Sequence, residues 1–141
     1  MAADTRVTSG GPLCHEDKIA RIGVSLYGMA GHATLAIVLL DWLRTARNRQ
    51  QLYKLIPENY RDEVAIMELS PSGISLWDGW GAARKLNDQD YAIGSGSMTA
   101  LGLLRKGDGL REAVAGAIGL DECSGPPIQV EYLKPPRKRK R

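Results

Sequence analysis

Apolar positions in the first 45 residues change from an extended spacing to a helical one. Residues 1–7 have the pattern of a strand interior, and a turn cluster with Gly and Pro follows at residues 8–12. The next apolar residues favour one or two paired strands: Ile19, Ile22, Val24, Leu26 and Tyr27. From Gly31 onward the apolar residues recur at helical spacing: Leu35, Ala36, Val38, Leu39, Trp42 and Leu43. The pattern therefore predicts an early β-hairpin followed by a helix.

The middle of the chain predicts a second hairpin. Two apolar-rich segments, 63–69 and 74–77, flank a Pro-Ser-Gly turn at residues 71–73. Residues 80–83 have the composition of a loop.

The C-terminal third predicts two helices between two short strands. A short apolar segment at 91–93 leads into the Gly-Ser turn at 94–97, and apolar residues follow at helical spacing: Met98, Leu101 and Leu104. Asp108 is expected to cap a further helix with the apolar residues Leu110, Val114, Ala117 and Ile118. Ile128, Val130 and Tyr132 then alternate as a final strand. Helices covering the outer faces of stacked sheets would pack this order best, so we expect an α+β fold with an αββα sandwich.

Length and charge separate one folded domain from a basic tail. The chain has 141 residues, enough for one domain with a substantial core. Six of its 19 Lys and Arg residues lie in the last eight positions, so residues 1–133 carry 13 basic against 16 acidic side chains. We therefore expect a mildly acidic domain at 1–133 and a disordered Pro-rich basic tail at 134–141.

Several classes of protein do not fit this composition. No apolar run is long enough to span a bilayer, and no basic segment followed by an apolar stretch indicates secretion, so the expected compartment is the cytoplasm. Cys14 and Cys123 lie far apart and outside any CxxC spacing, which favours reduced thiols and no metal. Cys14-His15-Glu16-Asp17 is interpreted as a polar loop, because adjacent residues seldom converge on one ion.

Separated motifs carry the most specific signal. In chain order they are Ala2-Ala3-Asp4-Thr5-Arg6-Val7-Thr8, Lys18, Tyr27-Gly28-Met29-Ala30-Gly31, Ala92-Ile93-Gly94-Ser95-Gly96 and Asp121-Glu122-Cys123-Ser124-Gly125. Their order and spacing resemble the proteasome β-subunit family and its bacterial ATP-dependent protease relatives, over nearly the whole chain. The resemblance implies a four-layer αββα sandwich of the N-terminal-nucleophile hydrolase type, with the first strand incomplete.

In that family an N-terminal threonine hydroxyl attacks the scissile carbonyl, and its own α-amino group serves as the base. The resemblance implies that Lys18 lies beside the nucleophile and that Asp4 pairs with it. Such a pair would keep a partly buried ammonium group charged. The alternative is an ordinary surface Asp and Lys.

Gly31 and Met29 match positions that face the substrate. The resemblance implies that the Gly31 backbone N–H stabilises the oxyanion, that Met29 lines the pocket for the substrate side chain, and that Thr8 borders the substrate-binding strand. Without the resemblance, Gly31 would simply begin a helix and Met29 would belong to the core.

Ser95, Asp121 and Ser124 match positions that orient the terminal amine and hydroxyl through hydrogen bonds. The Asp121–Gly125 motif is the more specific of the two. Gly94-Ser95-Gly96-Ser97 alone is a weak signal that could equally cradle an anion, but a nucleotide site would need a longer glycine loop with a lysine.

The nucleophile itself is missing from this match, because the family places its threonine upstream of the position of Met1. Thr5 and Thr8 are internal and have no free α-amine, so neither inherits the role. We expect a longer, active chain whose start lies upstream of Met1; a shortened, inactive relative is the alternative.

The sequence therefore predicts a threonine-type peptidase subunit, with a non-catalytic assembly subunit of the same fold as the alternative. The resemblance implies peptide or protein substrates, a homo-oligomeric ring and an ATPase unfoldase as a partner, with no cofactor and no metal. For the basic tail, a solubilising role or contact with an anionic partner is favoured over nucleic-acid binding, which would show steep salt dependence.

Overall fold

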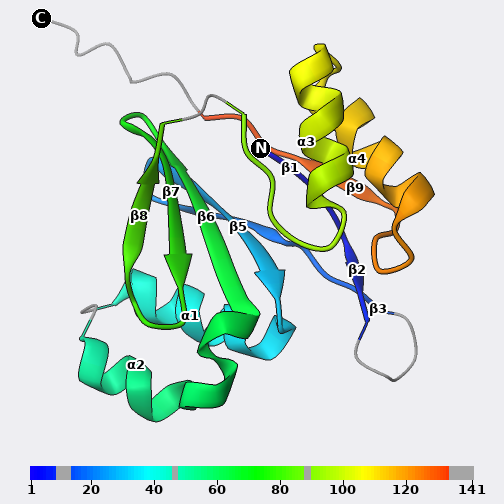
Figure 1. Ribbon diagram of the computed structural model, residues 1–141. Coiled ribbons are helices and arrows are strands. Elements are labelled where there is room, and N and C mark those ends of the chain that lie inside the picture. The colour runs from blue at the N-terminus through cyan, green and yellow to red at the C-terminus, as the bar shows by residue number, and fades with distance from the viewer. Residues whose placement is uncertain (9–13, 46–47, 88–89, 134–141) are drawn as a thin grey trace, which may run out of the picture.

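Figure 1 shows the computed structural model of the chain, which describes residues 1–8, 14–45, 48–87 and 90–133. Most of the predicted turn cluster at 8–12 and the whole tail at 134–141 lie outside these residues. The elements in chain order are β1 (Ala2–Asp4), β2 (Arg6–Val7), β3 (Cys14–His15), β4 (Ile19–Ile22), β5 (Ser25–Gly31), α1 (Ala33–Arg44), α2 (Arg49–Leu55), the 3₁₀ helix η1 (Glu58–Glu63), β6 (Val64–Ser70), β7 (Gly73–Asp78), β8 (Ala83–Leu86), α3 (Ser97–Lys106), α4 (Leu110–Leu120) and β9 (Ile128–Val130).

The largest sheet has five antiparallel strands in the order β4-β5-β6-β7-β8. The β4–β5 and β6–β7 hairpins confirm the two hairpins that the apolar pattern predicts. Gly23 has a φ of 58° in the first turn, and Gly73 has a φ of 122° at the second, conformations that glycine adopts without steric cost. Two further pairs, β1 with β9 and β2 with β3, complete the strands of the described residues.

Strand residues alternate between two cores on the two faces of the large sheet. Tyr27 and Ile66 belong to the main core, which α1 covers with Leu39, Leu40, Trp42 and Leu43. Their neighbours Leu26 and Met67 point to the other face, where they pack with Met1 and Ala3 of the small sheet. This period of two places one face of the large sheet against helices and the other against strands.

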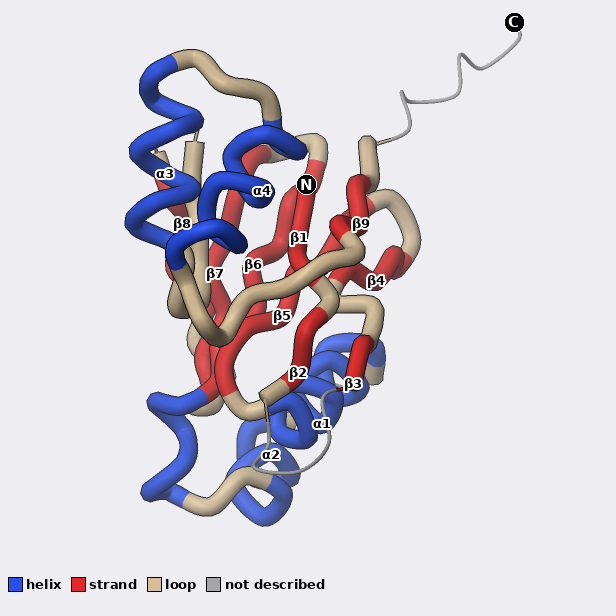
Figure 2. The backbone as a smooth tube through the Cα atoms, turned by 90° about the vertical axis from the view of Figure 1, so that its right-hand side faces the viewer, coloured by secondary structure: helices blue, strands red, loops and turns tan. Residues whose placement is uncertain are grey.

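Helix α4 packs on β1 and β9 and also on α3. The layers are therefore α1 and α2, the five-stranded sheet, the β1–β9 pair, and α3 with α4, and Figure 2 shows α4 beside β1, with α3 next to α4. This arrangement confirms the predicted αββα order of layers.

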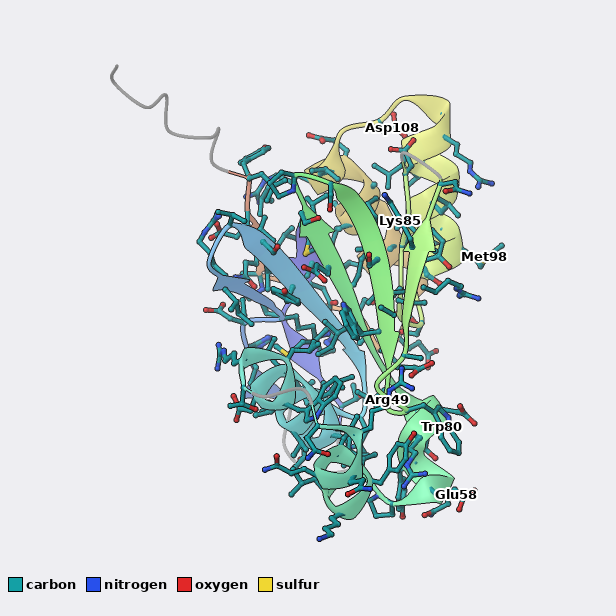
Figure 3. The ribbon with its side chains drawn as sticks, turned by 90° about the vertical axis from the view of Figure 1, so that its left-hand side faces the viewer. Arg49, Glu58, Trp80, Lys85, Met98 and Asp108 are labelled. Carbon is teal, nitrogen blue, oxygen red and sulfur yellow. The ribbon has the colours of Figure 1, made fainter. Side chains whose placement is uncertain are left out.

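The apolar pattern of the sequence does not predict helix α2 or strand β8. Leu52 is the buried residue of α2, so the helix has no apolar stripe, and its start depends on the Asn48 side chain, which accepts hydrogen bonds from two backbone N–H groups. Three of the four β8 residues are exposed on the sheet edge, so no alternation marks the strand. Figure 3 shows Lys85 on this strand, away from Arg49 and Trp80 at the other end of the sheet.

Three local predictions were wrong. Residues 91–93 join no strand ladder among the described residues, because the half-buried segment finds no neighbouring strand to pair with. Asp108 does not cap the following helix: Gly109 occupies the cap position, and no side chain accepts a hydrogen bond there. The final strand also ends at Val130, which leaves Tyr132 exposed.

Candidate active site

Asp4 and Lys18 form an ion pair where the first strand meets the large sheet. The Lys18 ammonium nitrogen lies 3.0 Å from Asp4 Oδ1 and 3.1 Å from Oδ2. The exposed fractions of the two side chains are 23% for Lys18 and 15% for Asp4, so solvent screens the pair only in part. An ordinary surface pair, the alternative interpretation, would be much more open.

The Asp4 carboxylate also ties β1 to the loop after α4. Asp4 Oδ2 accepts hydrogen bonds from the backbone N–H groups of Arg6 and Gly125, both at 3.1 Å. The main chain of β1 pairs with β9, with Asp4 opposite Ile128. Asp4 is therefore held by its backbone and by both carboxylate oxygens, which orients it toward Lys18.

Asp121 forms a second cluster with two serines. Ser95 donates its hydroxyl hydrogen to Asp121 Oδ2 at 2.6 Å, and Ser124 donates to the same oxygen at 2.5 Å. The backbone N–H of Cys123 reaches Asp121 Oδ1 at 3.3 Å. These donors, Ser124 foremost and then Ser95, lower the pKa of the Asp121 carboxyl, because they stabilise its charged form.

Sequence and electrostatics connect the two clusters. Ser124, which binds Asp121, directly precedes Gly125, which binds Asp4. The positive charge of Lys18 also contributes a small part to the lowered pKa of Asp121. One ammonium group therefore acts on two carboxylates that come from opposite ends of the chain.

The end of β5 borders this site. Met29 donates its backbone N–H to the Lys18 carbonyl at 2.8 Å, and a Cβ on Gly94 would stand 3.6 Å from the Ala30 Cβ. Gly31 follows with a φ of 90°, and a Cβ there would collide with the Glu63 carbonyl. The backbone of this strand end thus lies between Lys18 and the turn that carries Ser95, and only glycine fits at Gly31.

Met29 and Thr8, the residues predicted to contact the substrate, lie at the edge of the region that holds Asp4, Lys18 and Asp121. Met29 is partly buried and packs against the main core. Thr8 follows β2 and is exposed. An open pocket of about 280 Å³ is lined by Thr5, His15, Glu16, Asp17 and Pro127. The roles of Met29 and Thr8 toward a substrate stay predictions.

The sequence interpretation gave no individual role to three residues of this region: Arg6, Gly125 and Gln129. Arg6 donates from Nη1 to the Glu122 carbonyl at 3.0 Å, and its guanidinium occupies the space beside Gly125 where a Cβ would stand. Gln129 bonds the backbone of Ile19, next to Lys18. Arg6 and Gly125 fall inside the matched motifs, which could have drawn attention to them, but nothing in the sequence marks Gln129.

Two further findings concern the part of the chain that the structure describes. No three His, Cys, Asp or Glu side chains gather there as a metal site would require, and Cys14-His15-Glu16-Asp17 spans β3 and an exposed connection. None of the described helices has the length and apolar character needed to cross a bilayer.

Comparison with known proteins supports the fold. No protein-family model matches the sequence, and no curated protein matches it. Among solved structures, BPH of Thiobacillus denitrificans in complex with epoxomicin is 25% identical, with a TM-score of 0.71 over 95% of this chain and 92% of that chain. BPH of the same organism alone is 24% identical, with the same TM-score and coverage. Eukaryotic HslV from Trypanosoma brucei is 22% identical, with a TM-score of 0.69 over 92% of this chain and 90% of that chain. The chain thus has a proteasome β-subunit-like fold, as the motifs predict.

Proposed function

We propose that this chain, with its proteasome β-subunit-like fold, is the site-bearing part of a threonine-type peptidase subunit that hydrolyses amide bonds in peptides or proteins. The observation that supports this proposal best is the meeting of the predicted residues. The Asp4–Lys18 ion pair is joined to the Asp121 cluster at adjacent residues: Gly125 donates to Asp4, and Ser124, like Ser95, donates to Asp121. These residues come from separate segments of the chain, and a sandwich fold by itself does not require them to lie together.

In the proposed reaction, the nucleophile is the hydroxyl of an N-terminal threonine that precedes Met1 in the active chain. The threonine α-amine takes the hydroxyl proton as the oxygen attacks the substrate carbonyl, and it returns the proton to the leaving amine, which leaves an acyl ester on the threonine. Water then attacks this ester with the same amine as the base, which releases the carboxylic acid and restores the free hydroxyl. Ser95, Asp121 and Ser124 would orient that amine through their hydrogen-bonded cluster.

Lys18 would act through its charge. An ammonium group near the threonine oxygen favours the developing negative charge on that oxygen, which makes the hydroxyl easier to deprotonate. Asp4 holds the ammonium in place from 3.0 Å. The backbone N–H of Gly31 would then stabilise the oxyanion of the tetrahedral intermediate, a task that requires the close approach that glycine allows.

We also propose that the subunit works in a homo-oligomeric ring with an ATPase unfoldase as a partner. Met98 and Leu120 support contacts between subunits: their exposed fractions are 80% and 79%, and both lie where the start of α3 meets the end of α4. Figure 3 shows Met98 pointing outward from the body of the molecule.

The test is to express the gene with its in-frame upstream codons, processed so that the chain begins with threonine, and to assay fluorogenic peptide amides. We expect turnover in this extended chain and a loss of about 100-fold or more in kcat when Lys18 is replaced by Ala. Epoxomicin, the ligand of the BPH complex, serves as a second probe: a mass increase on the N-terminal threonine is expected.

Replacing that threonine by alanine is the matched control and should abolish both turnover and labelling. Ring formation without turnover or labelling in the extended chain would contradict the peptidase proposal. That result would instead support the alternative, a non-catalytic subunit that uses the same fold for assembly.

A further inference from the structure

The side chain of Gln129 pairs with the backbone of Ile19 as a neighbouring strand would. Its Oε1 accepts the Ile19 N–H at 3.0 Å, and its Nε2 donates to the Ile19 carbonyl at 3.0 Å. Only one orientation of the amide satisfies both bonds, because its oxygen must face the donor and its nitrogen the acceptor. The outer edge of β4 is therefore closed at this residue by a single side chain.

This contact fixes the peptide unit that joins Lys18 to Ile19. The carbonyl of that unit accepts the Met29 N–H at 2.8 Å from one side. Its N–H, which belongs to Ile19, donates to Gln129 on the other side. A peptide unit held at both ends cannot rotate, so the direction in which the Lys18 side chain leaves the backbone is set.

The same short strand also positions the partner of Lys18. In the β1–β9 ladder, Asp4 stands opposite Ile128, and Gln129 stands opposite Ala3. β9 thus holds Asp4 through main-chain pairing and Lys18 through the Gln129 side chain. Asp4 lies in β1 and Lys18 directly precedes β4, so Gln129 is one link between the segments that carry the carboxylate and the ammonium.

A second link joins β4 to the segment that follows β9 and provides a comparison. Arg21 donates to the Glu131 carboxylate at 3.2 Å and to the Tyr132 carbonyl at 2.8 Å. The exposed fractions of its side chains are 28% for Arg21 and 42% for Glu131, and the contact lies farther along β4 from Lys18. If both links only held the two sheets together, removing either one should have the same effect on the Lys18–Asp4 pair.

From this geometry we infer that Gln129 is a positioning residue, which holds Lys18 against Asp4 for the reaction. The inference rests on the proposed function for its catalytic meaning, whereas the positioning itself belongs to the chain as it stands. Gln129 touches neither the scissile bond nor the nucleophile in this scheme, and it acts only through Lys18.

The first experiment uses residues 1–141 and records ¹H–¹⁵N spectra of the lysine ammonium groups at low temperature. An ammonium that is hydrogen-bonded to a carboxylate exchanges its protons slowly enough to be seen, and Lys18→Met assigns the signal. We expect Gln129→Leu to abolish the Lys18 signal and Arg21→Met to retain it. A signal that survives Gln129→Leu, or that Arg21→Met removes equally, would overturn the inference.

Gln129→Glu guards against a misfolded Gln129→Leu variant. The glutamate keeps nearly the same shape and one acceptor but places an oxygen against the Ile19 carbonyl, so it should also lose the Lys18 signal. A Gln129→Glu chain with the signal of the parent would count against the role of the two-point contact.

The second experiment uses the extended chain with its N-terminal threonine. Gln129→Leu should lower kcat on the order of 100-fold, the effect of a displacement of about 1 Å in a catalytic group, with little change in KM. Arg21→Met should leave both constants near those of the parent. If the parent itself shows no turnover, the proposed function fails while the ammonium spectra still decide the positioning role. If the parent is active and Gln129→Leu leaves its kcat unchanged, the inference is overturned and the proposed function stands.

Discussion

The Ser124 hydroxyl lies 2.5 Å from Asp121 Oδ2 and donates its hydrogen to that oxygen. This contact is the largest cause of the lowered pKa of Asp121, ahead of the hydrogen bond from Ser95. Both hydrogen bonds favour the charged form of Asp121, the state in which it could orient an amine.

Ser124→Ala should therefore raise the pKa of Asp121 toward the ordinary aspartate value, and Ser95→Ala should raise it less. Carboxyl ¹³C titration by NMR measures both shifts, and Ser72→Ala in the exposed β6–β7 turn is a control that should change nothing. A larger shift for Ser95→Ala than for Ser124→Ala would show that the Ser95 hydrogen bond contributes more to the lowered pKa of Asp121 than the Ser124 bond does.

The same lowered pKa predicts how stability depends on pH. The charged carboxylate of Asp121 stabilises the fold at pH values above the ordinary aspartate pKa of about 3.9, and this contribution is lost as the pH falls through the lower folded-state value. Urea unfolding as a function of pH should therefore show a smaller acid-induced loss of stability in Asp121→Asn than in the parent. Equal losses would argue against Asp121 as a source of the acid sensitivity.

Asp4→Ala should destabilise the fold more than Lys18→Met does. The aspartate accepts from Lys18 and from two backbone N–H groups, so its removal leaves three donors without this acceptor and should cost about 3 kcal/mol. Lys18→Met leaves the carboxylate with its two backbone donors and should cost about 1 kcal/mol. Denaturant unfolding checks the order, and Asp41→Asn in the exposed Asp41–Arg44 pair should cost least.

Gly31→Ala should be far more damaging than Gly23→Ala. Both glycines have positive φ, so alanine is strained at either position by about 1–2 kcal/mol. At Gly31 the new Cβ also meets the Glu63 carbonyl, whereas at Gly23 it meets nothing within 4 Å. Thermal unfolding of the two variants separates strain alone from strain with collision, and similar melting temperatures would contradict the close approach at Gly31.

Gly125→Ala and Arg6→Ala should be strongly coupled. An added Cβ on Gly125 would displace the Arg6 guanidinium, whose buried Nε has no hydrogen-bond partner among the described residues. In an Arg6→Ala background that space is vacant, so Gly125→Ala should cost at least about 1 kcal/mol less than it does alone. A double-mutant cycle of unfolding free energies measures this difference, and additive costs would disprove the contact.

Regular periodicity explains which parts of the fold could be predicted. Apolar residues recur at helical spacing along α1, and apolar segments flank a tight turn in the β4–β5 and β6–β7 hairpins, so these elements are clear in the sequence. Helix α2 begins at an Asn48 cap and buries little, β8 is an exposed edge, and residues 91–93 are apolar without a strand partner. Local patterns were weak or misleading wherever neighbouring segments decide the conformation.

By itself, the sequence determined which residue types could form the site, because the motifs around Asp4, Lys18, Ser95 and Asp121 carry that information in the chain. Only the tertiary structure decided how these residues meet. It joins Asp4 to Gly125 across 121 positions and Ile19 to Gln129 across 110. Such contacts depend on which strand edges and loops are brought together when two sheets pack, and no spacing within a single segment encodes that distance.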